Sequence, residues 1–319
     1  MKKVLLIFIT VFASNYLFAQ IAIAKYKFID DEVQKLGSFA SKNVAEIADA
    51  VTAKYNTNEQ KARAIFYWIA NNIAIDPKAT KQNDQKNKEP EKVIALRKAT
   101  PLGFSLLVQE MCSYAKIRCL SVDGFVKNFV AEINEKIDEP NYSWNVVQLG
   151  QSPETWYYID ACRASGFVDK KQTTFTKQFT SQYFFADKKL FNLICFPNNM
   201  AWQLGGGINN LKQYYALPIF CNQAIGLEMR KPLPLTGLIK TKLKMPVSFS
   251  FAINNDITVS KISILIGDDK KQQKEEPMNF TNNNGNISFS YEFKKEDIFP
   301  IKIMIDGQEV LAYLIEVKE

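Results

Sequence analysis

The residues of this chain that could carry nucleophilic chemistry are its thiols, and they have no histidine to assist them. The 319-residue sequence contains no histidine at all. A cysteine nucleophile normally needs a neighbouring histidine, whose pKa lies near neutrality, to accept the thiol proton. The sequence therefore excludes an ordinary Cys-His-Asp mechanism. The five thiols are those of Cys112, Cys119, Cys162, Cys195 and Cys221.

The cysteines also lack the pattern of a metal site. Their number is odd, so at least one thiol is free or pairs with another molecule. No two of them have the CxxC spacing, and no histidine is present to complete a zinc site. The sequence therefore predicts no metal and no cofactor. We expect Cys112 and Cys119, at the end of a helix and the start of a strand, to pack as small apolar side chains.

The N-terminus has the form of a secretion signal. Lys2 and Lys3 precede an apolar stretch over residues 4–12, and Ala19 is a small residue at a plausible cleavage point. An uncleaved membrane anchor is the alternative, but the apolar run is well short of about 20 residues. We predict a signal peptide over residues 1–19 and export to the periplasm, the cell surface or the medium. No later stretch is long and apolar enough to be an integral membrane segment.

Composition predicts a well-filled globular protein. Apolar residues make up 47% of the chain and aromatic residues 13%. The formal net charge of +7 is modest, and no arginine-aromatic cluster indicates a nucleic-acid partner. A mature chain of about 300 residues exceeds the usual size of one core, so we expect two domains.

The first part of the mature chain has the periodicity of helices. Residues 26–76 are predicted to be helical, and Thr57 and Gln60 have the spacing of a capping box. Residues 77–91 are rich in lysine, glutamine and asparagine, so we expect an exposed loop there. One apolar helical face is formed by Ile65, Trp68, Ile69 and Ile73.

A second helix is predicted to begin near Thr100, with Thr100 as the N-cap and Pro101 at the first helical position. Short strands then follow. They are expected at residues 119–126, 144–149 and 156–161. Strands after helices favour an α+β arrangement with a mainly antiparallel sheet.

Beyond residue 225 the pattern alternates at period two. Residues 247–253, 287–293 and 301–305 have this pattern, and Asn284-Gly285 and Asp306-Gly307 are typical hairpin turns. So many strands in fewer than a hundred residues indicate a β-sandwich of immunoglobulin-like type. We therefore place an α+β domain at residues 20–225 and the sandwich at residues 226–319.

Four sequence blocks follow one another between about residues 40 and 215. They are residues 59–73; residues 97–112 with 117–119 and 122–125; residues 143–147 with 156–161; and residues 183–187 with 196–197 and 202–204. In order and spacing they resemble the transglutaminase-like superfamily, nearest its kyphoscoliosis-peptidase branch. The resemblance implies a papain-like cysteine-enzyme fold. Members of that branch often add a β-sandwich after this domain.

The resemblance also implies that the catalytic triad of Cys, His and Asp is lost. The nucleophile position, two residues before Gly103, holds Pro101, and the histidine position holds Tyr142. Only Asp160 is retained, and Arg163 stands where the family has a tryptophan. We therefore interpret the domain as a pseudoenzyme rather than an enzyme.

Pro101 removes two catalytic elements together. It lacks the thiol, and it also lacks a backbone N–H that would stabilise an oxyanion at the start of the helix. The helix itself loses nothing, because the N–H at this position has no intrahelical partner. The substitution preserves the fold while deleting the chemistry, so no activity of the family is expected.

Four residues near these positions are candidates for binding or for replacement chemistry. Cys162 lies two residues from Asp160, and Arg163 could lower its pKa; the alternative is a packed small residue or half of a disulfide. Trp144 and Asn145 could line a groove for a peptide or a sugar, although ordinary core packing is as good an interpretation for Trp144. Arg163 must reach water or a partner.

These observations favour an exported, catalytically inactive protein that binds or scaffolds proteins or peptides. A first alternative is a hydrolase with a rearranged site, which uses Cys162 or the carboxylates of Asp160 and Asp123. A second is a structural envelope component that assembles through the C-terminal sandwich. The ligand, the oligomeric state and the disulfide pairing stay open.

Overall fold

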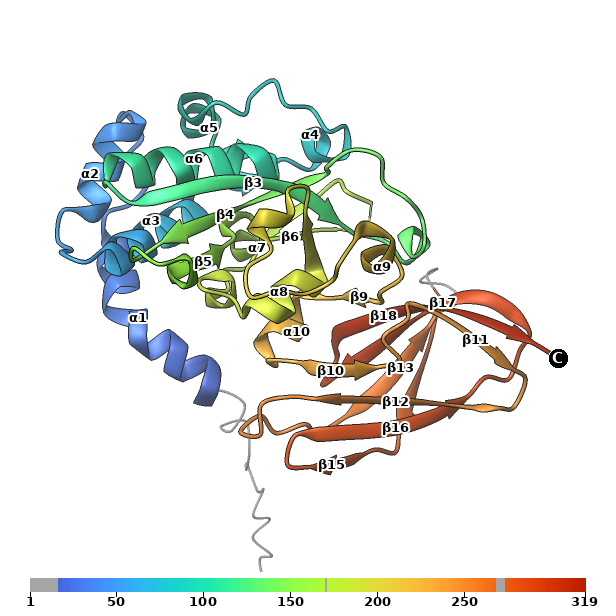
Figure 1. Ribbon diagram of the computed structural model, residues 1–319. Coiled ribbons are helices and arrows are strands. Elements are labelled where there is room, and N and C mark those ends of the chain that lie inside the picture. Colours follow the sequence, from blue (N-terminus) through green and yellow to red (C-terminus); the bar gives the residue numbers. More distant parts are fainter. Residues whose placement is uncertain (1–16, 170, 268–272) are drawn as a thin grey trace, which may run out of the picture.

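A computed structural model describes residues 17–169, 171–267 and 273–319 (Figure 1). The first sixteen residues of the predicted signal peptide lie outside these ranges. None of the helices within them is both long and apolar enough to cross a membrane.

The predicted helical stretch consists of three helices. They are α1 (Leu17–Lys35), α2 (Val44–Thr52) and α3 (Asn58–Asn72). The predicted capping box at the start of α3 is confirmed. Thr57 Oγ1 accepts from the Gln60 N–H at 3.2 Å, and Gln60 Oε1 accepts from the Thr57 N–H at 3.4 Å. Local hydrogen bonding therefore sets the start of this helix.

The prediction of a loop over residues 77–91 is wrong in part. Helix α4 (Pro77–Lys81) lies within it, and α5 (Pro90–Leu96) begins there. Asp76 Oδ1 accepts from the Ala79 N–H at 3.1 Å and so caps α4. No residue of α4 is buried, which is why apolar periodicity could not reveal this helix.

Helix α6 (Pro101–Tyr114) packs against the central antiparallel sheet, as Figure 1 shows along β3. The sheet has the order β5-β4-β3-β8. Its strands are β3 (Arg118–Val126), β4 (Tyr142–Gln148), β5 (Trp156–Ile159) and β8 (Cys195–Pro197). Thr100 caps α6 with Pro101 in its first turn, so both the predicted cap and the α+β arrangement are confirmed.

Short elements fill the space around this sheet. The paired strands are β1 (Ala74–Ile75) with β2 (Lys98–Ala99) and β6 (Gly166–Val168) with β7 (Phe175–Lys177). The helices are α7 (Ala161–Ser165), α8 (Lys188–Ile194), α9 (Leu211–Tyr215) and α10 (Asn222–Gly226). The 3₁₀ turns are η1 (Val130–Glu132), η2 (Pro153–Thr155), η3 (Ser181–Tyr183) and η4 (Met200–Trp202).

The C-terminal strands form two packed sheets, which confirms the predicted sandwich. One sheet contains, in order, β10 (Arg230–Leu233), β12 (Pro246–Ala252), β16 (Asn286–Glu292) and β15 (Thr281–Asn283). The other contains β11 (Leu238–Lys242), β18 (Gln308–Lys318), β17 (Asp297–Ile305), β13 (Ile262–Ile266) and β14 (Lys274–Met278). Strand β11 runs parallel to β18, and the other pairs are antiparallel.

Both predicted hairpin turns are confirmed, but each joins an expected strand to β15 or β18, which the sequence pattern did not indicate. Asn284 and Gly285 have φ of 51° and 78°, and Asp306 and Gly307 have φ of 47° and 79°. Two successive positive φ angles are the mark of the type I′ turn, which matches the twist of the flanking strands. These dipeptides therefore fix the β15–β16 and β17–β18 registers locally.

The two domains share a sheet. Strand β9 (Ile219–Phe220) pairs with β18, with Phe220 opposite Leu311. Val130 of η1 and Ala312 of β18 meet in a small buried cluster at the same junction. The α+β part therefore contributes a strand to the sandwich several residues before the predicted boundary at residue 226.

A buried arginine, Arg63, connects α1 and α3 to the segment directly after η3. Arg63 of α3 is 0% exposed, and its Nε and Nη2 donate to the two Asp30 oxygens at 2.8 and 2.6 Å. The guanidinium also lies 5.1 Å from the ring centroid of Phe184, directly after η3. Because the charge has no access to water, Asp30 is required to compensate it.

We predict that Asp30→Ala lowers the free energy of unfolding by about 3–5 kcal/mol, because it leaves the buried guanidinium without its counter-charge. The matched control is Asp31→Ala on the same helix. Asp31 pairs with Lys27 at the surface, so its loss is expected to cost less than about 1 kcal/mol. Urea unfolding of the two variants measures the difference, and equal losses would contradict this role for Arg63.

Candidate functional site

The carboxylate of Asp160 is the centre of the candidate site. Asp160 follows β5 and is the N-cap of α7, where its Oδ1 accepts from the Arg163 N–H at 2.9 Å. The Tyr142 hydroxyl donates to both carboxylate oxygens, at 3.0 and 3.2 Å. Asp160 is only 1% exposed, so these donors replace water. Two of the three positions expected to hold a triad, Tyr142 and Asp160, therefore meet here.

The Arg163 side chain closes the site from the other side. Its Nε lies 3.7 Å from Asp160 Oδ2, and its guanidinium carbon lies 5.0 Å from the centroid of the Tyr142 ring. Nη1 donates to Asn222 Oδ1 at 2.9 Å, and the Tyr183 hydroxyl donates to the same oxygen at 2.6 Å. We call Tyr142, Asp160, Arg163, Tyr183 and Asn222 the Asp160 cluster.

The electrostatics of the cluster follow from burial. Burial raises the pKa of Asp160 to about 6, although the Arg163 guanidinium, the Arg163 N–H and the Tyr142 hydroxyl all act to lower it. Burial, and then the Asp160 charge, raise the pKa of Tyr142 well above its ordinary value. Tyr142 therefore stays a protonated donor and cannot accept a proton from a thiol, which is the task of a catalytic histidine.

Pro101 lies on an element that packs against the rest of the site. It begins α6, which contacts both β4, where Tyr142 lies, and α7, which Asp160 caps. Asn145 Nδ2 donates to the Ser105 carbonyl at 2.9 Å, so the first turns of α6 lie beside β4. The three triad positions are thus on neighbouring elements, and the direct contact is between Tyr142 and Asp160.

Cys162 has no features of a nucleophile. It is 2% exposed, and burial raises the pKa of its thiol far above the ordinary value, with the Asp160 charge adding to the rise. Arg163 and Tyr142 lower the pKa by less than burial raises it, so of the two interpretations of Cys162 the structure favours a packed small residue. Burial likewise raises the pKa of Cys195 to about 12.

The groove expected at Trp144 and Asn145 is not open in this structure. Both residues are 1% exposed. Trp144 packs against Phe191 of α8 with ring centroids 5.7 Å apart, and a side chain at Gly124 would lie within 2.5 Å of the Trp144 ring. Both residues are therefore packed in the core because β4 is covered on both faces.

The carboxylate pair of the hydrolase alternative does not form. Asp123 is exposed and accepts from the Ser143 hydroxyl at 2.7 Å, whereas Asp160 is buried and accepts from Tyr142. Within the described ranges, no hydrogen bond connects the two carboxylates and they share no donor. A pair that divides acid and base roles needs both groups at one reacting bond.

Sequence reasoning missed the junction pocket, a cavity of about 260 Å³ beside the Asp160 cluster. It lies where the α+β domain meets β18. Its lining includes Lys127, Arg163, Tyr214, Phe220, Asn222 and Glu309. Asn222 is 59 residues from Arg163 and Glu309 lies in the sandwich, so no local pattern could have predicted this arrangement. The described residues contain no cluster of three or more His, Cys, Asp or Glu side chains able to hold a metal ion.

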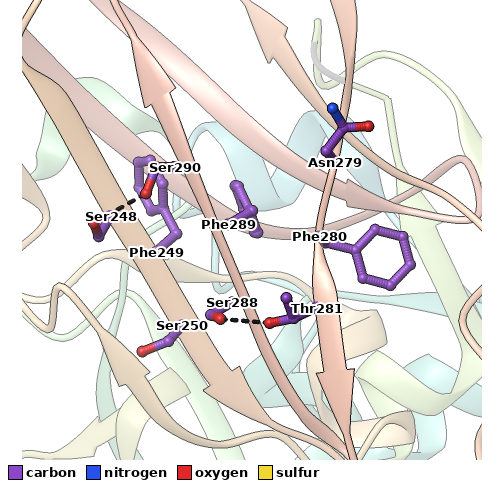
Figure 2. A pocket seen from close by; sticks show the side chains of 9 residues that line it. All are labelled: Ser248, Phe249, Ser250, Asn279, Phe280, Thr281, Ser288, Phe289 and Ser290. Carbon is purple, nitrogen blue, oxygen red and sulfur yellow. Dashed lines mark hydrogen bonds between the residues drawn. The ribbon is translucent and has the colours of Figure 1, made fainter.

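A second hollow, of about 520 Å³, lies on the outer face of the sandwich (Figure 2). Its floor consists of serine side chains of β12 and β16, and two hydrogen bonds tie the hydroxyls together: Ser248 with Ser290 at 3.0 Å, and Thr281 with Ser288 at 2.8 Å. No charged residue lines this hollow. Four of its five hydroxyls are paired with one another, and its described lining has no charge, so the junction pocket is the stronger candidate for ligand binding.

The chain has clear relatives. The transglutaminase-like superfamily matches it over residues 45–161. The kyphoscoliosis peptidase of Homo sapiens is 27% identical over 216 residues, which cover 66% of this chain and 32% of that protein. The kyphoscoliosis peptidase of Mus musculus is 26% identical over 219 residues, covering 66% and 33%. A crystal structure of a TGase has 18% identity and a TM-score of 0.29, covering 50% of this chain and 36% of that one.

The similarity is partial in length. The matches to the two peptidases cover 32% and 33% of those proteins, so most of each relative has no counterpart in the comparison. The matched region, residues 45–161, includes Pro101, Tyr142 and Asp160.

We predict that Asp160 makes stability fall as pH rises from about 4 to about 7. The folded state holds the Asp160 proton up to a pKa of about 6, whereas the ordinary value is 3.8, so the folded chain binds more protons in this window. Asp160→Asn should lose less stability over the same range than the unaltered protein. Urea unfolding at pH 4 and pH 7 tests this, with Asp123→Asn as the exposed-carboxylate control; parallel pH profiles of Asp160→Asn and the unaltered protein would contradict it.

We also predict that the Cys162 thiol resists labelling in the folded protein, because it is buried and protonated. Iodoacetamide at pH 7, followed by mass spectrometry, should give the same number of labels in the native Cys162→Ala variant as in the unaltered protein. In urea the variant should carry one label fewer. Rapid native labelling of Cys162 would restore the cysteine-hydrolase alternative.

Proposed function

Residues 45–161 form a domain of the transglutaminase-like superfamily, and we propose that in this chain the domain is catalytically inactive and serves as a protein- or peptide-binding or scaffolding module. In this proposal the protein is exported under the signal peptide predicted over residues 1–19. The kyphoscoliosis peptidases are much longer than the region that matches this chain, so their activity is not transferred to it.

The observation that carries the proposal is the closed hydrogen bonding of the Asp160 cluster. The Tyr142 hydroxyl occupies both oxygens of Asp160, the carboxylate that would orient a histidine in the family. Tyr142 is a donor at neutral pH, and the sequence offers no histidine to replace it. Residue 101 is a proline and cannot act as a nucleophile, and none of the described groups beside Asp160 can accept a proton from one. A missing nucleophile or base alone costs about six orders of magnitude in a comparable triad.

The geometry does not favour the hydrolase alternatives. Cys162 has a buried thiol with a raised pKa, and Asp123 and Asp160 have different environments and different partners. The structural-component alternative has less specific support, since the described lining of the hollow on the sandwich is uncharged and most of its hydroxyls are paired. The junction pocket combines charged and apolar lining, which supports a binding role.

We predict that the unaltered protein neither hydrolyses peptides nor incorporates amines into proteins, and that Pro101→Cys with Tyr142→His gains measurable turnover. The double variant restores a thiol at the start of α6 and an imidazole beside Asp160, which can then orient it. Peptide hydrolysis and amine incorporation are both followed on purified protein.

The matched control is Pro101→Cys with Tyr142→Phe, which has the same thiol but no base and should stay silent. Activity that depends on the imidazole would show that the scaffold still positions a triad. Turnover by the unaltered protein would refute the proposal of an inactive domain.

A further inference from the structure

Arg163 presents spare hydrogen-bonding capacity to the junction pocket. Its guanidinium has five N–H donors: Nη1 donates to Asn222 Oδ1, and Tyr183 and Cys195 are further hydrogen-bonding neighbours, so these partners do not use all five. Nε is buried without a hydrogen-bond acceptor. The side chain is 17% exposed and is held against the Tyr142 ring and Asp160. It is therefore a preorganised donor, and a planar guanidinium matches a carboxylate.

The described lining of the pocket has more cationic than acidic side chains, and Arg163 is also paired with Asp160 behind the pocket, with Nε 3.7 Å from Oδ2. Lys127 and Arg163 are the cations of the lining, and the one acid, Glu309, is engaged by Lys302 at 2.5 Å. Lys127 Nζ donates to backbone carbonyls at and just after the end of α9, at 2.7, 2.7 and 3.4 Å. Burial lowers the pKa of Lys127 to about 7, so Arg163 is the permanent cation of the pocket and also supplies the donors.

The remaining walls of the pocket are apolar. They include Val168 of β6, Leu193 and Ile194 of α8, and Ile219 and Phe220 of β9. Apolar walls with a few convergent polar groups are typical of a small-ligand site. The volume of about 260 Å³ lies just below the lower limit of about 300 Å³ for such sites. The pocket is therefore of a size for a peptide end or one side chain, and not for a long segment.

We propose that the junction pocket binds a peptide carboxylate next to an apolar side chain, with Arg163 as the carboxylate ligand. The inference rests on the proposed function, because it names the place and the chemical class of the bound peptide. Two sources offer this chemistry: the C-terminal carboxylate of a chain that ends in an apolar residue, and an acidic side chain beside an apolar one. Capture of a terminal carboxylate is a recurring mode of peptide recognition.

Calorimetric titration of the full chain distinguishes the two sources. Three N-acetylated peptides are the probes: Ala-Ala-Leu with a free carboxylate, the same peptide as its amide, and the amide of Ala-Leu-Asp-Ala. Binding of the free acid but not of its amide assigns the pocket to a C-terminus. Binding of the aspartyl amide alone assigns it to an acidic side chain.

The decisive variant is Asn222→Asp. An aspartate at this position keeps an oxygen to accept from Arg163 and Tyr183, so the fold retains both hydrogen bonds. It adds a negative charge beside the guanidinium, and we expect the affinity for the carboxylate probe to fall by about tenfold or more. Asn56→Asp, the same change at an exposed position of the N-terminal helical region, is the control and should leave binding unchanged.

The outcomes separate this inference from the proposed function. Failure of all three probes to bind, or equal binding by Asn222→Asp and the unaltered protein, overturns the assignment of the pocket. Mass spectrometry of the recovered peptides is run in parallel. Intact peptides without binding refute the pocket alone, whereas cleaved peptides refute the proposal of an inactive domain.

Discussion

The carboxylate of Asp160 is buried where β5 passes into α7, and a buried anion is stable only when donors and charges are arranged around it. Four groups depend on that requirement. The Tyr142 hydroxyl, the backbone N–H of Arg163 and its guanidinium all point at the carboxylate, and Asn222 holds the guanidinium from behind. The start of β4, the turn into α7 and the first residue of α10 are thereby fixed relative to one another.

Under the proposed function, this arrangement explains how the domain could lose its chemistry without losing its fold. In an active relative the carboxylate would orient an imidazole, and here a phenol satisfies the same oxygens. Pro101 suits the first position of α6 because the N–H that it lacks has no intrahelical partner. Pro101 thus meets the local requirement of the backbone and Tyr142 that of Asp160, and neither side chain is a nucleophile or a base.

The sandwich is attached to the site through the backbone. Strand β9 pairs with β18, and Asn222 lies two residues after β9. Lys127 ties the end of α9 to β3 through three carbonyls, and burial lowers its pKa to about 7. The pocket between the domains is therefore built from rigid elements on both sides, which is the condition for a preorganised binding site.

The sequence by itself determined the features that depend on near neighbours along the chain. The Thr57 and Thr100 caps and the two glycine turns follow from hydrogen bonds and φ angles within four residues, and the loss of histidine needed no structure at all. Tertiary structure decided which polar residues meet. Trp144 was a candidate for a groove, but β4 is covered on both faces and the side chain is buried. Arg163 and Asn222 are far apart in sequence, and only folding brings them into contact. Burial raises the pKa values of Asp160 and Cys162. Because burial depends on all the elements packed around a residue, it cannot be read from the neighbouring sequence.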